Sequence, residues 1–272
     1  MSYKPREVKA KTIEEHREYL FEIVRLKLFF LWNWLKEHPE ETVQKVLRER
    51  VDIYRKTSVN TGLLNPTELH TETPEWLGYE KAVEELYCKH NNDEAAFEAA
   101  AFEVFQPSIE ERLPKDFADT SGTAGYQCGS LQYNLMEEGK IHLTIGFHIA
   151  NAIQPHSIFE DPQYLPRCFV ELMNETEKRY SSRILSTGTW LNSLPRWLEI
   201  FPEEWQENLS EPHEDVQWHY GYWGQFITAR GTFNYKYAKI LRLTGKLPFY
   251  HRSSHCSFAN MRRHLKDKYA VM

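Results

Sequence analysis

The chain has 272 residues, of which 41% are hydrophobic, 14% aromatic and 26% charged, and its formal net charge is −6. A chain of this size and composition can bury a large hydrophobic core, which excludes an intrinsically disordered protein. Its most apolar stretch, Leu26 to Leu35, contains Lys27 and Asn33 and has about half of the roughly 20 residues that a transmembrane helix needs, so we expect no membrane partner.

The first hundred residues are predicted to be helical. Apolar residues recur at helical spacing over residues 12–38, which predicts a long amphipathic helix. A proline at the first position favours a second helix over residues 39–56. Cap and start signals predict two more helices, over residues 73–90 and 93–105.

The clearest strand signal is an alternation of apolar and polar residues. It extends over residues 131–135 and again over 141–149, and a Glu-Glu-Gly-Lys turn lies between the two runs. A period of two is typical of strands that are buried on one face, so the pattern predicts an antiparallel hairpin with one apolar and one polar face.

The remaining chain is predicted to be mixed. A helix is expected over residues 161–180, a short strand from residue 184, a proline-interrupted helical segment over 194–205 and a helix over 218–243. Ser257 is expected to cap a last helix that ends near residue 268.

These elements predict a helix-rich α+β fold. An N-terminal helical block would accompany a small sheet that contains the antiparallel hairpin and is covered by C-terminal helices. We expect one compact domain over residues 1–272, with a possible subdivision into a helical block, 1–117, and an α+β part, 118–272.

The cysteines and the N-terminal residues indicate a compartment. Cys88, Cys128, Cys168 and Cys256 form no Cys-x-x-Cys pair, which argues against a disulfide framework. The first residues contain charges and no apolar segment of the kind found in secretory signals. A soluble, cytoplasmic protein is therefore expected.

Charge is distributed unevenly along the chain. Residues 229–269 contain ten Lys or Arg and one acidic residue, Asp267, which gives a segment of net charge +9 in a chain of −6. One interpretation is a site for an anionic partner, such as a phosphorylated or carboxylated metabolite or a CoA-like thioester. The other is a basic face that docks against the acidic N-terminal helices. Nucleic acid is disfavoured because the chain is acidic overall and has no recognition motif.

Three residues of the C-terminal part are candidates for binding an anionic substrate. Arg230 and Asn234 lie four residues apart on the helix predicted over 218–243, and they would flank its apolar face. A guanidinium beside aromatic residues can hold a carboxylate or phosphate through two hydrogen bonds, so Arg230 is the preferred anchor. Arg252 is the third candidate.

The run from His251 to Ser257 has the highest density of reactive side chains. If Ser257 caps a helix, Cys256 precedes a helix N-terminus and has His255 beside it, an environment that lowers the pKa of a thiol. A Cys-His nucleophilic site is one hypothesis. A metal site through His251, His255 and Cys256 is the alternative, and a structural role is the third interpretation.

The polar face of the predicted hairpin offers a second set of catalytic candidates. His148 lies on that face, and His156 follows in the loop after it. If the face points into the protein, both residues become acid/base candidates. If it points outward, they are ordinary solvent-facing residues.

The sequence predicts a broad functional class. It contains no Walker A, Gly-x-Gly-x-x-Gly, His-Glu-x-x-His or Gly-x-Ser-x-Gly motif, and it leaves the cofactor unknown. The leading hypothesis is a small-molecule enzyme that acts on an anionic substrate by acid/base or Cys-His chemistry. The alternatives are a non-catalytic scaffold with a basic C-terminal face, with a homo-oligomer among its possible assemblies, and the metal protein.

Overall fold

The computed structural model describes residues 7–61, 71–119 and 121–271. The chain divides into two compact units, and each is described by itself. The helical unit comprises Lys11–Gly122 and Asp215–Pro248. The α/β unit comprises Thr123–Glu214 together with the described residues before Lys11 and after Pro248. The helical unit thus includes a segment far beyond residue 117, and the single-domain organisation stays a prediction.

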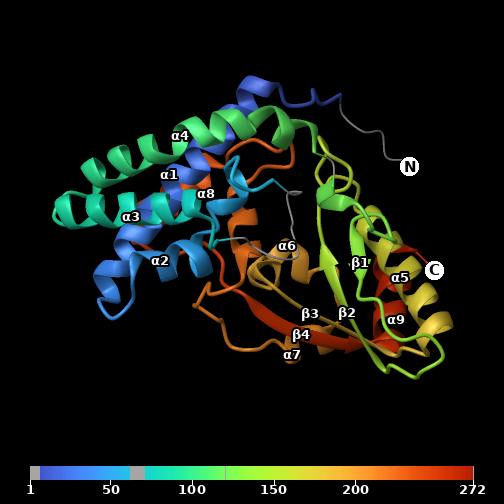
Figure 1. Ribbon diagram of the computed structural model, residues 1–272. Helices are drawn as coiled ribbons and strands as arrows, with labels where there is room; N and C mark the ends of the chain where they lie inside the picture. The colour runs from blue at the N-terminus through green and yellow to red at the C-terminus, as the bar shows by residue number, and fades with distance from the viewer. Residues whose placement is uncertain (1–6, 62–70, 120, 272) are drawn as a thin grey trace. The chain divides into compact units, whose positions relative to one another are not determined.

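Two long helices, α1 (Ile13–Glu37) and α4 (Glu94–Ala118), form the centre of the helical unit (Figure 1). They run antiparallel, because Arg17 near the start of α1 pairs with Glu110 near the end of α4, whereas Phe21 packs against Phe102, farther back on α4. The smaller helices around them are α2 (Val43–Val46), α3 (Pro74–Lys89) and α8 (Tyr235–Thr244).

The predicted helices of this unit are confirmed in part. The helices α1 and α3 match their predictions closely, and Thr12 and Thr73 cap them with their side chains. Helix α4 extends well beyond residue 105, although Pro107 and Pro114 lie inside it. A proline removes one helical hydrogen bond, but packing against α1 along most of its length keeps α4 helical.

The segment between α2 and α3 is not the regular helix predicted over residues 39–56. Residues Leu47–Val51 form a π-helical turn, η1, and Tyr54–Lys56 form a 3-10 turn, η2. Between them Asp52 has φ 50° and ψ 50°, a left-handed conformation that residues other than glycine rarely adopt. Such π turns and left-handed residues are frequent at functional sites.

The prediction of one helix over residues 218–243 is also wrong, because only the last part of this range is α-helical. A 3-10 segment, η5 (Tyr220–Phe226), is followed by a tight turn, and α8 begins only at Tyr235. Gly231 has φ 80° in that turn, and Ile227 and Phe233 bridge as an isolated antiparallel pair. The glycine that interrupts the helical pattern therefore marks a reversal of the chain.

The α/β unit is built on one four-stranded mixed sheet (Figure 1). The strands, in spatial order, are β1 (Leu131–Tyr133), β2 (Thr144–Ile149), β3 (Ile184–Thr189) and β4 (Arg252–Ser257). Strands β2 and β3 are parallel, and the other two pairs are antiparallel. A parallel pair needs a crossover, which α5 (Tyr164–Tyr180) provides. Short elements and the last helix complete the unit: η4 (Trp190–Ser193), α6 (Pro195–Leu198), α7 (Glu203–Glu207) and α9 (Phe258–Tyr269). The 3-10 turn η3 (Ser121–Thr123) lies where the helical unit ends and this unit begins.

The helix-rich α+β prediction is therefore confirmed, but the hairpin differs in detail. Strands β1 and β2 pair antiparallel with Tyr133 opposite Phe147, as expected. The strands are shorter than predicted, and Leu135 and Ile141 in the connection between them are exposed. The sheet also continues on the other side of β2 with a parallel partner, which alternation within one strand could not predict.

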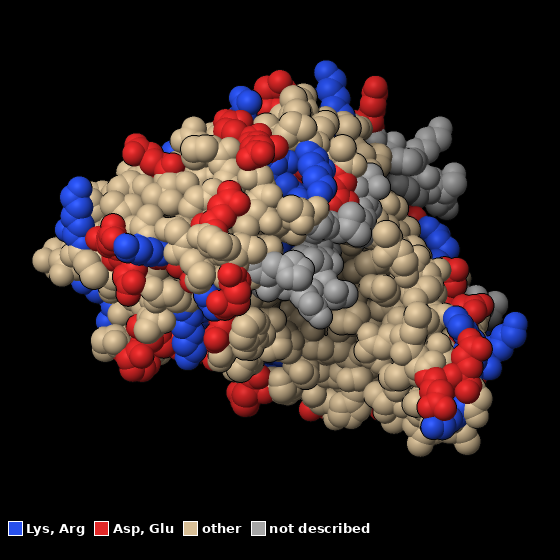
Figure 2. Space-filling model, in the orientation of Figure 1, with Lys and Arg blue, Asp and Glu red and all other residues tan. Residues whose placement is uncertain are grey.

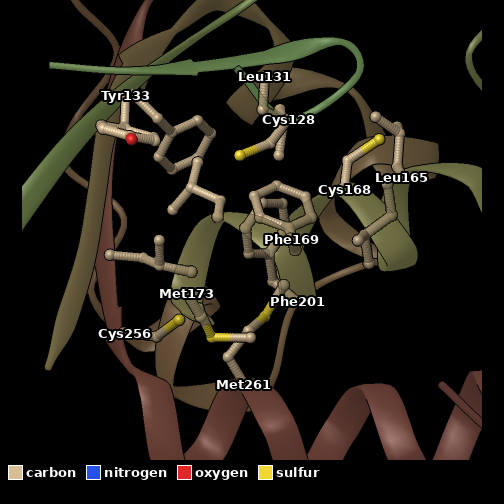
Figure 3. Close-up of a cluster of buried hydrophobic side chains, with 14 of the residues drawn as sticks. Cys128, Leu131, Tyr133, Leu165, Cys168, Phe169, Met173, Phe201, Cys256 and Met261 are labelled. Atoms are coloured by element: carbon tan, nitrogen blue, oxygen red, sulfur yellow. The ribbon is translucent and has the colours of Figure 1, made fainter. Parts of the chain in front are cut away.

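The apolar face of the sheet supplies much of the core of the α/β unit. Ile145 and Phe147 of β2 point into it, and the rings of Phe169 and Phe201 pack there at 5.1 Å. Figure 3 shows the thiol of Cys256 in this core, near Met173 and Met261. The opposite face of the sheet carries mainly small and polar residues, among them Gly146, Ser186 and His255.

A membrane span is not found in the described ranges, where no helix is both long and apolar enough to cross a bilayer.

Candidate functional site

The two side chains of the predicted Cys-His pair point in different directions. Cys256 is fully buried in β4, and His255 beside it is exposed. Neighbouring residues of a strand point to opposite faces of the sheet. Burial raises the pKa of the Cys256 thiol far above its usual value, although Ser257 caps α9 as predicted. The core around the sulfur outweighs the nearby helix start, so these surroundings favour the neutral thiol and give the predicted nucleophile no support.

The metal alternative lacks the geometry that it needs. His251 lies directly before β4 and His255 lies within it, whereas Cys256 of the same strand points into the core. Within residues 7–61, 71–119 and 121–271, no group of three or more His, Cys, Asp or Glu residues is arranged to hold a metal ion.

The structure places His148 and His255 on the same polar face of the sheet. The strand register aligns Gly146 with Ser186 and Ser186 with His255, and His148 belongs to the same face of β2 as Gly146. Both histidines are exposed, and the His148 Nε2 atom lies 3.0 Å from the Asn134 Oδ1 atom. A solvent-facing role is the simplest interpretation of this face.

His156 is separate from these histidines in its contacts. Its Nδ1 atom lies 3.1 Å from Glu160 Oε2, four residues later in the chain, and its side chain is half-buried. This hydrogen bond accounts for the position of the ring within its own loop.

The predicted anion-binding residues have protein partners. Arg230 lies in the turn before α8, where its guanidinium contacts both carboxylate oxygens of Glu15 at 2.9 and 3.0 Å. Asn234 caps α8 by accepting a hydrogen bond from the Tyr237 amide. Arg252 donates to the Ser210 carbonyl at 2.7 Å. Arg230 and Asn234 belong to the helical unit and Arg252 to the α/β unit.

Other arginines of the basic segment also pair with acidic residues. Arg242 contacts both carboxylate oxygens of Glu98 at 2.7 and 2.9 Å, and Arg262 pairs with Glu177 at 2.6 Å. In the view of Figure 2, basic and acidic side chains are interspersed over the helices α1 to α4. Part of the basic segment therefore serves internal ion pairs.

The helical unit contains a buried ionic cluster that sequence reasoning missed. At its centre is His16, only 3% exposed, whose two ring nitrogens both have partners. Its Nε2 atom lies 2.9 Å from Asp116 Oδ2, and its Nδ1 atom lies 2.8 Å from Lys11 Nζ. Lys56 completes the cluster, with its Nζ atom 3.7 Å from Asp116 Oδ1. We call Lys11, His16, Lys56 and Asp116 the polar cluster.

The start of α1 positions two members of the polar cluster. Thr12 and Glu15 form a capping box, in which each side chain bonds the other residue's backbone N–H. This motif brings the residue before the cap close to the fourth residue of the helix. Those positions usually hold two apolar side chains, but here they hold Lys11 and His16. The Arg230 ion pair with Glu15 supports the same box.

The hydrogen-bond chain indicates the protonation of the histidine. Burial lowers the pKa of His16, which favours the neutral ring. In a neutral ring that donates from Nε2 to Asp116, the Nδ1 atom is a lone-pair acceptor. The partner with protons to give is then the Lys11 amine. Burial also lowers the pKa of Lys11, with Asp116 acting in the opposite direction.

The charges on Asp116 and Lys56 support each other. Burial alone would raise the pKa of the Asp116 carboxyl, but Lys56, His16 and Arg112 outweigh it and the pKa is lowered. Burial alone would lower the pKa of Lys56, but Tyr19, Asp116 and Asp52 raise it. Both groups are therefore charged at neutral pH.

One atom of the polar cluster is incompletely satisfied. Asp116 Oδ1 is buried and has no hydrogen-bond partner in the described part of the chain. Its ion pair with Lys56, at 3.7 Å, is too long for a hydrogen bond. A buried carboxylate oxygen without a donor is costly, so a ligand or water with a donor would be stabilised there.

A second buried lysine lies deeper in the same unit. Lys27 on α1 is 2% exposed, and its Nζ atom donates to the carbonyl of the left-handed Asp52 at 2.9 Å. Burial lowers the pKa of Lys27 to about 7, and it raises the pKa of the Asp52 carboxyl. Groups with perturbed pKa values gather at functional sites more often than elsewhere.

Some signals for these residues were present in the sequence. The pattern Thr-x-x-Glu at residues 12–15 is a capping box, and Lys27 stands out as a charge in the most apolar stretch. Asp116 is one hundred residues from His16, so only the antiparallel packing of α1 and α4 brings them together.

Comparison of the chain with models of protein families found no match, and the searches of curated proteins and of solved structures found none either.

Proposed function

We propose that the protein is a small-molecule enzyme that acts on an anionic substrate by acid/base chemistry, and that its site is the polar cluster of the helical unit. The observation that carries the proposal is the position of His16, held between the Asp116 carboxylate at 2.9 Å and the Lys11 amine at 2.8 Å. A histidine oriented by a carboxylate is a common general base.

The substrate charge follows from the basic side chains of the cluster. Lys56 is 16% exposed at its side chain and is charged at neutral pH, and Lys11 is half-buried beside it in the field of the same Asp116. A carboxylate or phosphate gains from such partly desolvated ammonium groups.

The other predicted catalytic residues receive less support. His148, His156 and His255 lie in the α/β unit, and their contacts do not gather them around one atom. The scaffold alternative also has less support, because Arg230 and Arg242 of its basic face are engaged with carboxylates.

We also propose a cytoplasmic location, because all four cysteines are free. Nucleic acid is not among the proposed partners, and assembly into a homo-oligomer stays a prediction.

A ligand screen tests the proposal. The thermal unfolding of the wild-type protein is measured with carboxylates, phosphorylated metabolites and CoA thioesters, and hits are titrated by calorimetry. A ligand that binds the folded state raises its melting temperature by mass action. Lys56→Met is expected to abolish the ligand-induced rise in melting temperature, whereas Lys56→Arg should retain part of this rise because the charge is kept.

The matched control is Lys36→Met, which removes an exposed lysine of α1. It should respond to the ligand as the wild type does. Equal responses of Lys36→Met and Lys56→Met, or no anionic ligand at all, would contradict the proposed site.

A further inference from the structure

The order of groups in the polar cluster suggests a second role for Lys11. Asp116 orients His16, and His16 in turn contacts the Lys11 amine. The same order of orienting group, base and nucleophile activates side chains in covalent catalysis. An amine in the nucleophile position attacks carbonyl carbons.

We propose that Lys11 is a nucleophilic amine that forms a Schiff base with an aldehyde or ketone carrying an anionic group. This inference rests on the proposed function of the polar cluster and names its substrate class. The geometry on which it stands is the chain from Asp116 Oδ2 through both nitrogens of His16 to Lys11 Nζ.

His16 is suited to prepare the amine for attack. A lysine reacts through its neutral form, so its ammonium must first lose a proton. The Nδ1 atom of His16 lies 2.8 Å from Lys11 Nζ, within reach for that transfer. The Asp116 carboxylate on the other nitrogen stabilises the imidazolium that results, as in other carboxylate-oriented histidines.

The chemical step balances within the cluster and substrate. The lone pair of Lys11 Nζ forms a bond to the carbonyl carbon as the carbon–oxygen π bond breaks, and one proton moves from the nitrogen to the resulting alkoxide oxygen to give a neutral carbinolamine. The hydroxyl then takes the proton from the imidazolium of His16, the carbon–oxygen bond breaks to release water, and the nitrogen lone pair forms the carbon–nitrogen double bond of a protonated Schiff base. No oxidant or reductant takes part.

The surroundings of Lys11 favour this amine over the exposed lysines. Its side chain is half-buried, and burial together with Lys56 makes its protonated form less favourable. Lys56 remains charged and can attract the anionic group of the carbonyl compound.

Reductive trapping tests the inference on the wild-type protein. The protein is incubated at pH 7.5 with limiting glyoxylate and cyanoborohydride, which reduces an imine to a stable amine, and modified lysines are identified by peptide mass spectrometry. Lys11 is expected to be modified at least tenfold faster than the exposed Lys36, which serves as the reference in the same sample. Equal rates at the two lysines would overturn the inference.

Two further probes examine the anionic group. Glyceraldehyde 3-phosphate replaces the carboxylate of glyoxylate by a phosphate, and glyceraldehyde has no charge. At least one of the two anionic probes, glyoxylate or glyceraldehyde 3-phosphate, is expected to modify Lys11 faster than the neutral glyceraldehyde does. Trapping at Lys11 that is equally fast with the neutral probe would overturn the anionic part of the substrate class.

Variants separate this inference from the proposed function. Lys11→Arg removes the primary amine and is expected to lose trapping, because a guanidinium does not form the Schiff base. His16→Gln should reduce trapping at Lys11 to the rate of Lys36, and circular dichroism confirms that each variant is folded. If a ligand binds at Lys56 but Lys11 is not trapped, the Schiff base is refuted and the anion site stands.

Discussion

The buried amine of Lys27 leads to a quantitative prediction about stability. Burial lowers its pKa from 10.5 to about 7, whereas the unfolded chain keeps the usual value. At a pH between these two pKa values, Lys27 is protonated in the unfolded chain and neutral in the folded chain. Stability therefore rises with pH over this range, because the state with more bound protons is disfavoured as pH increases.

The magnitude follows from the two pKa values. A tenfold difference in proton affinity corresponds to about 1.4 kcal/mol. From pH 7 to pH 9, Lys27 should add about 2 kcal/mol to the free energy of unfolding of the wild-type protein. Lys27→Met removes the titrating group, so its free energy of unfolding lacks this increase. The free energy of unfolding of the variant minus that of the wild type should therefore fall by the same amount between pH 7 and pH 9.

The variant also loses the hydrogen bond to the Asp52 carbonyl. That loss costs about 1–3 kcal/mol, but it is the same at every pH and does not affect the slope. The assay is urea unfolding at pH 6, 7, 8 and 9, followed by tryptophan fluorescence. Lys36→Met is the control, because Lys36 lies on the same helix and is exposed. Parallel pH profiles of wild type and Lys27→Met would refute the reasoning.

Three further predictions concern local features. Thr12→Ala removes the cap of α1 and should lower the free energy of unfolding by about 1 kcal/mol, measured by urea unfolding, whereas Thr12→Ser should not. Cys88 is exposed and should react with a thiol reagent in the native protein, whereas Cys256 should react only after unfolding; fast native labelling of Cys256 would contradict its burial. Gly188→Ala places a Cβ atom 2.5 Å from the ring of His251, and because this ring is the far end of a side chain that can rotate away, urea unfolding should show a cost of about 1 kcal/mol that is relieved when His251→Ala is also present.

Local structure in this protein was largely predictable from the sequence. The helix starts at Thr12, Thr73 and Ser257 are recognisable because a capping side chain bonds a backbone amide only three residues away. The apolar face of β2 is recognisable because alternate residues of a strand share a face. These signals depend on neighbours in the chain, and they also sufficed for the helix-rich α+β class.

The direction of a side chain relative to distant elements was not predictable in the same way. Cys256 precedes a capped helix as expected, but the strand that contains it points its thiol into the core. Arg230 lies in a turn at Gly231, where a helical pattern of apolar residues had predicted a helix. In both cases packing against other elements overrides the local pattern.

The candidate site illustrates the same limit. The capping box that brings Lys11 and His16 together lies within six consecutive residues. The sequence by itself therefore determined that these two members of the polar cluster are neighbours. Asp116 and Lys56 join it only because α4 packs antiparallel to α1 and because η2 follows the left-handed turn at Asp52. The tertiary structure decided the chemistry of His16, since its burial and its carboxylate partner both come from residues far away in the chain.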